Sequence, residues 1–169
     1  KDKSDLIVEI GSNDGYLLQY FRDRRVPVLG VEPAGNVAAA AIRKGIPTEV
    51  CFFNCETARR LVASGRSADL LVGNNVLAQV PNLHDFVEAI RILLKPRGIL
   101  TMEFPHLKRL IEGNQFDTIY HEHYSYFSFR TVERLFVEHG IILFDVEELL
   151  THGGSLRIYG RHVGNDSQP

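Results

Sequence analysis

Short apolar runs alternate with longer amphipathic segments over most of the chain. In the longer segments apolar residues recur every three or four positions, and glycine or proline ends the segment, which is typical of helices. The helical segments are 15–24, 36–45, 55–65 and 83–98. The runs with the length of buried strands are 6–10, 28–32, 48–53, 69–74 and 99–104. This alternation predicts a mostly parallel sheet covered by helices on both faces.

The pattern changes after residue 104. Residues 130–140 have helical spacing, and two strand-like runs follow at 141–149 and 155–162. Only a turn of the THGG type lies between these two runs, which leaves no room for a crossover helix. We therefore expect an antiparallel hairpin at the end of an α/β domain.

Composition and charge narrow the class of protein. The chain has 169 residues, of which 44% are hydrophobic, and we assign 1–164 to one domain and 165–169 to a linker. The net charge is −2 and no basic run marks a nucleic-acid or anionic-lipid surface. No apolar run reaches the length of about 20 residues that spans a bilayer. We expect neither nucleic acid nor a membrane as partner.

The cysteines indicate the redox compartment, and the chain ends indicate whether the sequence is part of a longer protein. Cys51 and Cys55 have no second pair, which favours reduced thiols over a disulfide or a metal clip. A reducing compartment, most simply the cytoplasm, is expected. The start KDKSD resembles no signal peptide and lacks a methionine, so the chain is interpreted as a domain of a longer protein.

The stretch VEIGSNDGYLL holds the first candidate binding loop. Gly11 and Gly15 follow the first strand, where glycine allows a tight turn and close approach of a ligand, and Ser12 and Asn13 lie between them. The spacing differs from the dinucleotide pattern. Glu9, two residues earlier, would repel a pyrophosphate and suit a cationic ligand, which favours S-adenosylmethionine over NAD. A purely structural turn is the alternative.

Polar residues at two further strand ends support nucleoside binding. Glu32 ends the second strand, seventeen residues after Gly15, and is placed to accept both ribose hydroxyls. Pro33 stops the strand at that point. Asn74 and Asn75 end the fourth strand and are able to hydrogen-bond the polar tail of the ligand, although paired asparagines also form turns.

Five motifs together resemble a known family. VEIGSNDGYLL, GVEPAGNVA, NNVLAQVPNLHDF, FDTIYHEHYSYFS and THGGSLRIY are similar to the sugar C-methyltransferases that act on nucleotide-linked ketosugars with S-adenosylmethionine. The resemblance covers almost the whole chain. It implies a Rossmann-like class I methyltransferase fold, with six parallel strands and an antiparallel seventh inserted by a terminal hairpin. Family members usually add an N-terminal zinc-binding module and a C-terminal domain, and this chain resembles the central domain only.

The resemblance also implies a reaction and its residues. A dTDP-type nucleotide sugar is the expected substrate, methylated beside its 4-keto group through an enolate. His123 corresponds to the base, and Glu122 to a partner that holds the imidazole tautomer or binds substrate. A neutral histidine suits proton abstraction near pH 7. Tyr120 and its aromatic neighbours would exclude water and touch the sugar or the enolate oxygen. The flanking domains are expected to help grip the substrate, so this domain should bind cofactor with little turnover.

Other residues of these motifs are weaker candidates. His121 and Tyr124 are substrate-side candidates, although an isolated histidine such as His121 is more typical of a hydrogen-bonded structural residue. Gln79 stands where many relatives have histidine, and glutamine does not exchange a proton near neutral pH. No metal is expected, because nothing in the spacing of His84 and His106 recommends them as further ligands. An O- or N-methyltransferase and a non-catalytic cofactor-binding domain are the alternative functions.

Overall fold

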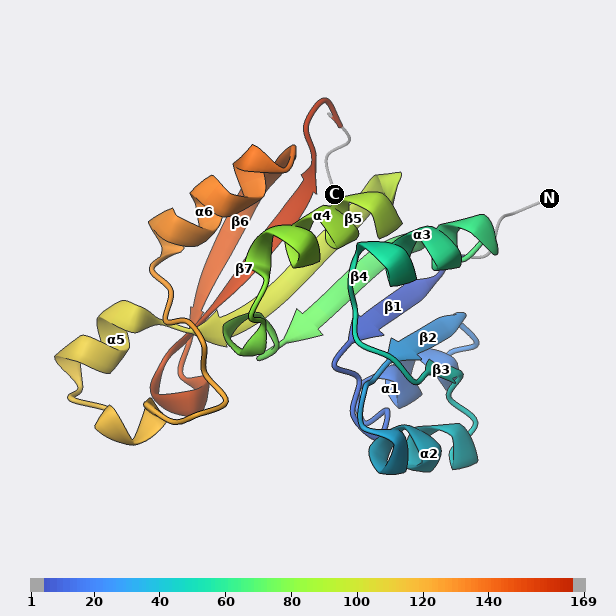
Figure 1. The fold of residues 1–169 in the computed structure, drawn as a ribbon, viewed down its shortest axis with the longest axis horizontal. Helices are drawn as coiled ribbons and strands as arrows, with labels where there is room; N and C mark the ends of the chain where they lie inside the picture. Colours follow the sequence, from blue (N-terminus) through green and yellow to red (C-terminus); the bar gives the residue numbers. More distant parts are fainter. Residues whose placement is uncertain (1–4, 166–169) are drawn as a thin grey trace.

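A single mixed β-sheet organises the chain (Figure 1). The structure is a computed structural model that describes residues 5–165. Within these residues the sheet has seven strands in the order β3-β2-β1-β4-β5-β7-β6. The strands are β1 (Ile7–Ile10), β2 (Val28–Val31), β3 (Thr48–Glu49), β4 (Ala68–Asn74), β5 (Leu94–Pro105), β6 (Ile141–Leu149) and β7 (Ser155–His162).

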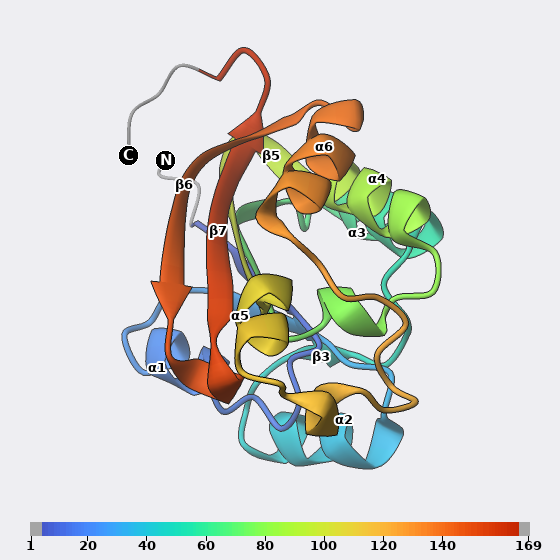
Figure 2. The same ribbon diagram turned by 90° about the vertical axis from the view of Figure 1, so that its left-hand side faces the viewer.

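Helices connect the strands and cover parts of both faces. They are α1 (Leu18–Arg22), α2 (Gly35–Arg43), α3 (Cys55–Ala63), α4 (Leu83–Leu93), α5 (Leu107–Glu112) and α6 (Phe129–Glu138), with 3-10 turns η1 (Leu77–Gln79), η2 (Phe116–Thr118) and η3 (Thr151–Gly153). The helices α3, α4 and α6 lie on one face of the sheet (Figure 2), and the larger apolar core joins them to it. A smaller core joins α1 and α2 to the other face.

The strand directions confirm the predicted fold class. β1 to β5 pair in parallel, and β7 is antiparallel to both β5 and β6. β6 therefore runs parallel to the first five strands, and β7 is the single reversed strand between β5 and β6. The predicted hairpin is confirmed, with strand bounds equal to those expected from the sequence.

Four predicted elements differ clearly from the structure, the fifth strand among them, which spans Leu94–Pro105 and not 99–104. The first helix begins at Leu18, three residues after Gly15, because the preceding residues form turns. The third strand has only Thr48–Glu49, since it pairs at the sheet edge over two residues. The fourth helix ends at Leu93, before Pro96, in keeping with the extended backbone that proline imposes on the residue before it. The chain then enters β5 directly.

The sheet is not covered by helices on both faces throughout. On the side of α1 and α2, the part formed by β5, β7 and β6 bears polar side chains instead. There Arg157 bridges Glu103 at 2.8 Å and Glu147 at 3.9 Å. The alternation of inward Leu156 and Ile158 with outward Arg157 and Tyr159 gives β7 one apolar and one polar face. Among residues 5–165, no helix is long and apolar enough to cross a membrane.

Candidate functional site

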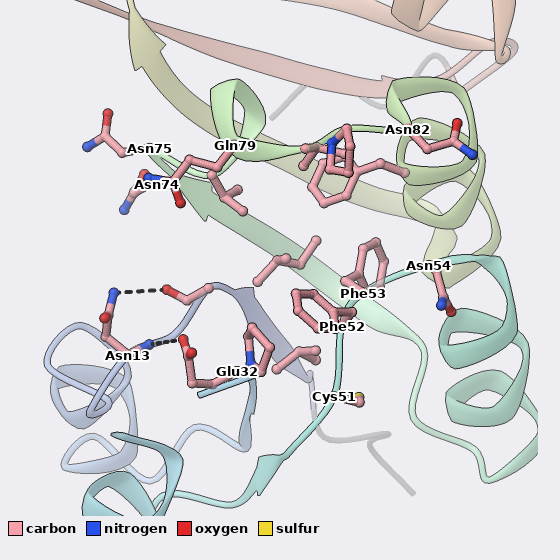
Figure 3. Close-up of a pocket in the computed structure, with 18 of the residues that line it drawn as sticks. Asn13, Glu32, Cys51, Phe52, Phe53, Asn54, Asn74, Asn75, Gln79 and Asn82 are labelled. Atoms are coloured by element: carbon pink, nitrogen blue, oxygen red, sulfur yellow. Dashed lines mark hydrogen bonds between the residues drawn. The ribbon is translucent and has the colours of Figure 1, made fainter. Parts of the chain in front are cut away.

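A large cleft of about 800 Å³ opens at the carboxyl ends of β1, β2 and β4 (Figure 3). This is the edge at which open α/β sheets bind ligands, because the loops after parallel strands converge there. Most of the residues predicted to bind cofactor line this large cleft. They are Gly11, Asn13, Glu32, Pro33, Asn74 and Asn75, and the cleft is also lined by Gln79 and Glu122.

Glu32 is held in one orientation by two backbone amides. Its Oε2 accepts from the Asn13 N–H at 3.0 Å, and its Oε1 accepts from the Ala34 N–H at 2.8 Å. The carboxylate is buried, yet it lines the large cleft. A carboxylate has about four acceptor positions, so two amides leave capacity for two ligand hydroxyls. The arrangement places a fixed acceptor where the sequence predicts the ribose.

The glycine loop has a partly different role from the one its sequence suggests. Gly11 lines the large cleft, but Gly15 and Ser12 do not. The Gly15 N–H donates to the Ser12 carbonyl at 3.0 Å, and a Cβ on Gly15 would lie 2.3 Å from Ile46 Cδ1. Gly15 has φ +76, so glycine is required there for backbone and packing reasons. Ser12 is fully buried beneath the loop beside Gly30.

Glu9 is not a surface charge beside the loop. It is 1% exposed, it lies outside the lining of the large cleft, and its Oε2 has no hydrogen-bond partner among residues 5–165. Burial raises the pKa of this carboxyl from 4.5 to about 8. Glu9 is therefore mostly protonated at pH 7 and is not the ionised cofactor-binding carboxylate expected from the sequence.

Two asparagines close the β4 side of the large cleft. Asn74 and Tyr16 both line the large cleft, and the pKa of Tyr16 is raised mainly by burial and also by the charges of Glu9 and Glu103. Asn75 has φ +55, its N–H donates to the Glu103 carbonyl at 2.8 Å, and its buried Oδ1 has no partner among the described residues. A buried acceptor without a partner is costly unless a ligand satisfies it. Asn75 is therefore suited to bind a donor group of a ligand.

The loop after β3 contributes lining residues that the sequence analysis missed. Cys51, Phe52, Phe53 and Asn54 line the large cleft opposite Asn74 (Figure 3). Phe53 packs edge-on against Phe86 of α4 with ring centroids 5.5 Å apart. The sequence predicted a strand over 48–53, so the loop that follows Glu49 was not recognised as part of the site. The position of this loop in the chain could have identified it, since the loops after parallel strands all lie at the edge of the sheet where ligands bind.

A small hollow of about 430 Å³ adjoins the large cleft. Asn75 and Gln79 line both cavities, so the two meet at the end of β4 and in η1. The small hollow is also lined by Pro105, Gln115, Asp117, Thr118, Tyr120, His123, His152 and Gly153. The predicted base thus lines a space that joins the predicted cofactor cleft.

The imidazole of His123 is oriented by a backbone carbonyl. Its Nδ1 lies 3.0 Å from the carbonyl oxygen of Thr118. A carbonyl only accepts, so Nδ1 carries the proton and the lone pair is on Nε2. The Tyr120 ring lies 4.3 Å from the imidazole, centroid to centroid. Glu122, expected as a possible holder of the tautomer, makes no hydrogen bond to His123 and lines the large cleft instead.

The rest of the aromatic segment is more open than expected. Residues 119–128 form a loop fixed to η1 by the Tyr124 N–H, which donates to the Ala78 carbonyl at 2.8 Å. Tyr124 is 65% exposed, and neither Tyr124 nor His121 lines the two cavities. A turn at Tyr120–His123 directs His121 outward instead of extending the chain. The aromatic side chains therefore do not seal this side of the small hollow.

Two histidines outside both cavities, His84 and His139, contact other side chains of the protein. His84 Nδ1 lies 3.1 Å from His139 Nε2, and His139 Nδ1 lies 3.2 Å from a Glu88 carboxylate oxygen. Burial lowers the pKa of His106. No group of three or more potential metal ligands comes together between residues 5 and 165. Cys51 and Cys55 are both free thiols.

Comparison with known proteins assigns the family. A family model described as a methyltransferase domain matches residues 1–148. The chain belongs to this methyltransferase family. It is 37% identical over 164 residues to the C-methyltransferase NovU of Streptomyces niveus, across 97% of this chain and 39% of NovU. The chain thus spans about two fifths of the length of that curated relative.

Solved methyltransferases share the fold at low sequence identity. One is an S-adenosylmethionine-dependent methyltransferase of Clostridium acetobutylicum, with a TM-score of 0.71, 9% identity, and coverage of 96% of this chain and 85% of that one. Another is magnesium protoporphyrin IX methyltransferase of Synechocystis with bound SAH, with a TM-score of 0.69, 12% identity, and coverage of 93% and 74%.

The cofactor of this methyltransferase is S-adenosylmethionine. The large cleft fits it in size and in chemistry: a fixed carboxylate at Glu32 faces the cleft, and the buried Asn75 Oδ1 needs a donor. A cleft of about 300–1,000 Å³ is usual for ligands of this size.

Proposed function

We propose that this methyltransferase methylates carbon next to the ketone of a nucleotide-linked 4-ketosugar. The observation that carries the proposal is the position of His123, in a small hollow that meets the cofactor cleft at Asn75 and Gln79. An acceptor in that hollow has a base on one side and the cofactor cleft next to it. The similarity to a protein named C-methyltransferase supports carbon as the methylated atom.

The chemistry of the hollow suits proton abstraction. His123 Nε2 takes the proton of the carbon beside the ketone, and the electron pair forms an enolate. Bound S-adenosylmethionine would supply a methyl group carried on a positively charged sulfur. The enolate carbon would bond to that methyl carbon, and the methyl–sulfur bond would break with its electron pair left on sulfur. A positioned base contributes about 10²–10⁴-fold. The Thr118 carbonyl stabilises the imidazolium that results, because the proton on Nδ1 remains hydrogen-bonded.

Other residues have supporting roles in the proposal. Glu32 and Asn75 bind the ribose and the polar tail of the cofactor, with Gly11 and Asn13 allowing close approach. Tyr120 lies against the imidazole and faces the small hollow. Glu122 and Gln79 contact the acceptor from the side of the large cleft.

The rest of the longer protein belongs to the proposal as well. The exposed setting of Tyr120 and Tyr124 leaves the acceptor side open, so we propose that flanking domains outside residues 1–169 complete the grip on a dTDP-type substrate. Free Cys51 and Cys55 are compatible with a reducing compartment, and we propose the cytoplasm.

The experiment is methyl transfer by the longer protein that contains this domain. S-adenosylmethionine labelled with carbon-13 in its methyl group is mixed with a dTDP-linked 4-keto-6-deoxysugar, and the product is examined by NMR. The proposal expects a new methyl group coupled to ring carbon. A label attached to oxygen or nitrogen contradicts carbon methylation. Binding of the cofactor without any transfer favours a non-catalytic domain.

A further inference from the structure

The turn between β6 and β7 brings a second imidazole into the small hollow. His152 lies in η3 and lines the hollow together with His123. This residue was not a candidate from the sequence. Its backbone has φ 52 and ψ 38, in the left-handed region that non-glycine residues adopt uncommonly, asparagine, aspartate and histidine more often than the rest. Its imidazole makes no hydrogen bond to any residue between 5 and 165.

Hydrogen bonds fix the turn on both sides of His152. Thr151 Oγ1 donates to a Glu103 carboxylate oxygen at 2.7 Å, and the Gly154 N–H donates to the Thr151 carbonyl at 2.9 Å. Gln115 Nε2 donates to the Gly153 carbonyl at 2.7 Å. The His152 backbone is therefore anchored to β5 and to the segment before His123.

Packing also prevents the turn from relaxing. A Cβ on Gly153 would lie 2.5 Å from Gln115 Oε1, and one on Gly154 would lie 2.8 Å from Arg109 Cβ. Gly153 and Gly154 have φ values of +76 and +123. The chain on the far side of His152 thus fits tightly against α5 and Gln115. The backbone of His152 is held in the left-handed region, and its exposed side chain lines the hollow.

The backbone alone does not require histidine at this position. Glycine and asparagine adopt the left-handed region at least as readily, and the imidazole contributes no internal hydrogen bond. Strained residues held by their surroundings cluster at functional sites. The fixed backbone places the His152 imidazole at the small hollow, where its N–H is available to whatever fills that space.

We propose that His152 donates a hydrogen bond to the ketone oxygen as the enolate forms. This proposal rests on the proposed function above. The proton leaves carbon for His123 Nε2, the electron pair moves to the ketone oxygen, and the His152 N–H stabilises the negative charge there. The carbon–oxygen double bond returns when carbon bonds to the methyl group. The titratable side chains lining the hollow are Asp117, Tyr120, His123 and His152.

The left-handed backbone makes a clean test possible. In His152→Gly the backbone is unstrained and the donor is lost, whereas in His152→Asn the backbone is again well suited and a shorter N–H donor remains. Arg25→Gly is the matched control, because Arg25 also has positive φ, at 61, and lies in the exposed turn after α1. All proteins are the longer chain, assayed with a dTDP-linked 4-keto-6-deoxysugar.

Two rates are measured for each variant: methyl transfer, and exchange of the proton beside the ketone in D₂O with the demethylated cofactor. We expect His152→Gly to slow both about 100-fold, as for loss of one oxyanion donor. His152→Asn should recover part of that loss, and cofactor affinity and thermal stability should not fall. Arg25→Gly should match the wild type.

The outcomes separate this proposal from the one on which it rests. Normal exchange and transfer in His152→Gly would overturn the role of His152 and leave the proposed function standing. Equal losses in the Gly and Asn variants would also overturn it, since the donor would then not matter. Absence of exchange and transfer in the wild type would contradict the proposed function itself.

Discussion

The Nδ1 atom of His123 lies 3.0 Å from the carbonyl oxygen of Thr118, five residues earlier in the chain. This contact determines the tautomer of the proposed base without a carboxylate partner. Thr118 is itself fixed, because its N–H and Oγ1 both donate to the Gln115 carbonyl, at 3.2 and 2.8 Å. Gln115 also binds the turn that carries His152. Gln115 thus holds both backbone segments from which the two imidazoles of the small hollow are positioned, through Thr118 on one side and Gly153 on the other.

Glu32→Gln should weaken cofactor binding. The amide keeps one acceptor oxygen but loses the charge that strengthens the hydrogen bond from the Asn13 N–H and the proposed hydrogen bonds from the ribose hydroxyls. Hydrogen bonds to charged groups contribute about 1.5–3 kcal/mol, which corresponds to an affinity loss of about 10- to 100-fold. Calorimetry with S-adenosylmethionine and with its demethylated product measures the change.

Glu56→Gln is the control for Glu32, since Glu56 is an exposed residue in the first turn of α3 that does not line the large cleft. Its affinity should equal that of the wild type. Equal affinities for Glu32→Gln and Glu56→Gln would exclude Glu32 as a cofactor ligand.

Glu9→Gln should remove a pH dependence of stability. Burial raises the folded-state pKa of Glu9 to about 8 from 4.5, so folding favours the protonated form. The contribution of Glu9 to the free energy of unfolding is complete below about pH 4.5 and is lost as the pH rises through about 8. The free energy of unfolding of the wild type should therefore fall, relative to Glu9→Gln, by up to about 1.4 kcal/mol per pH unit in that window. Urea unfolding near pH 5 and near pH 8 measures this, and a constant difference would refute the burial argument.

Gly15→Ala should destabilise the fold more than Gly65→Ala. Both glycines have positive φ, +76 and +78, so alanine strains the backbone at each by about 1–2 kcal/mol. A Cβ at Gly15 also meets Ile46 Cδ1 at 2.3 Å, whereas none of the described atoms lies within 4 Å of one at Gly65. Overpacking adds about 1–3 kcal/mol at Gly15. Equal free energies of unfolding in urea for the two variants would mean that Gly15 serves no packing role.

The sequence predicted the fold well where periodicity alone determines the element. The strands at 141–149 and 155–162 match the structure, because their apolar and polar residues follow the two-residue period of a strand and not the spacing of a helix. The third strand was overestimated, since the apolar residues Cys51 to Phe53 are lining residues of a loop and not part of a strand. Local patterns do not distinguish an apolar strand from an apolar binding loop.

The candidate site was predictable only in part. Strand ends identified Glu32, Asn74 and Asn75, which all line the large cleft, because parallel strands place their carboxyl ends at one edge. Burial was not predictable, so Glu9 was interpreted as an ionised carboxylate close to the ligand, whereas it is buried and mostly protonated at pH 7. His152 was missed because its position in the hollow depends on the tertiary contacts of a turn with Gln115 and Glu103.

The most direct test of the central claim is hydrogen exchange by His123→Asn. The longer protein, its demethylated cofactor and a dTDP-linked 4-keto-6-deoxysugar are mixed in D₂O, and deuterium beside the ketone is followed by NMR. The account predicts exchange in the wild type and a loss of about 10²–10⁴-fold in His123→Asn with cofactor affinity unchanged. Exchange at the wild-type rate in the variant would contradict it.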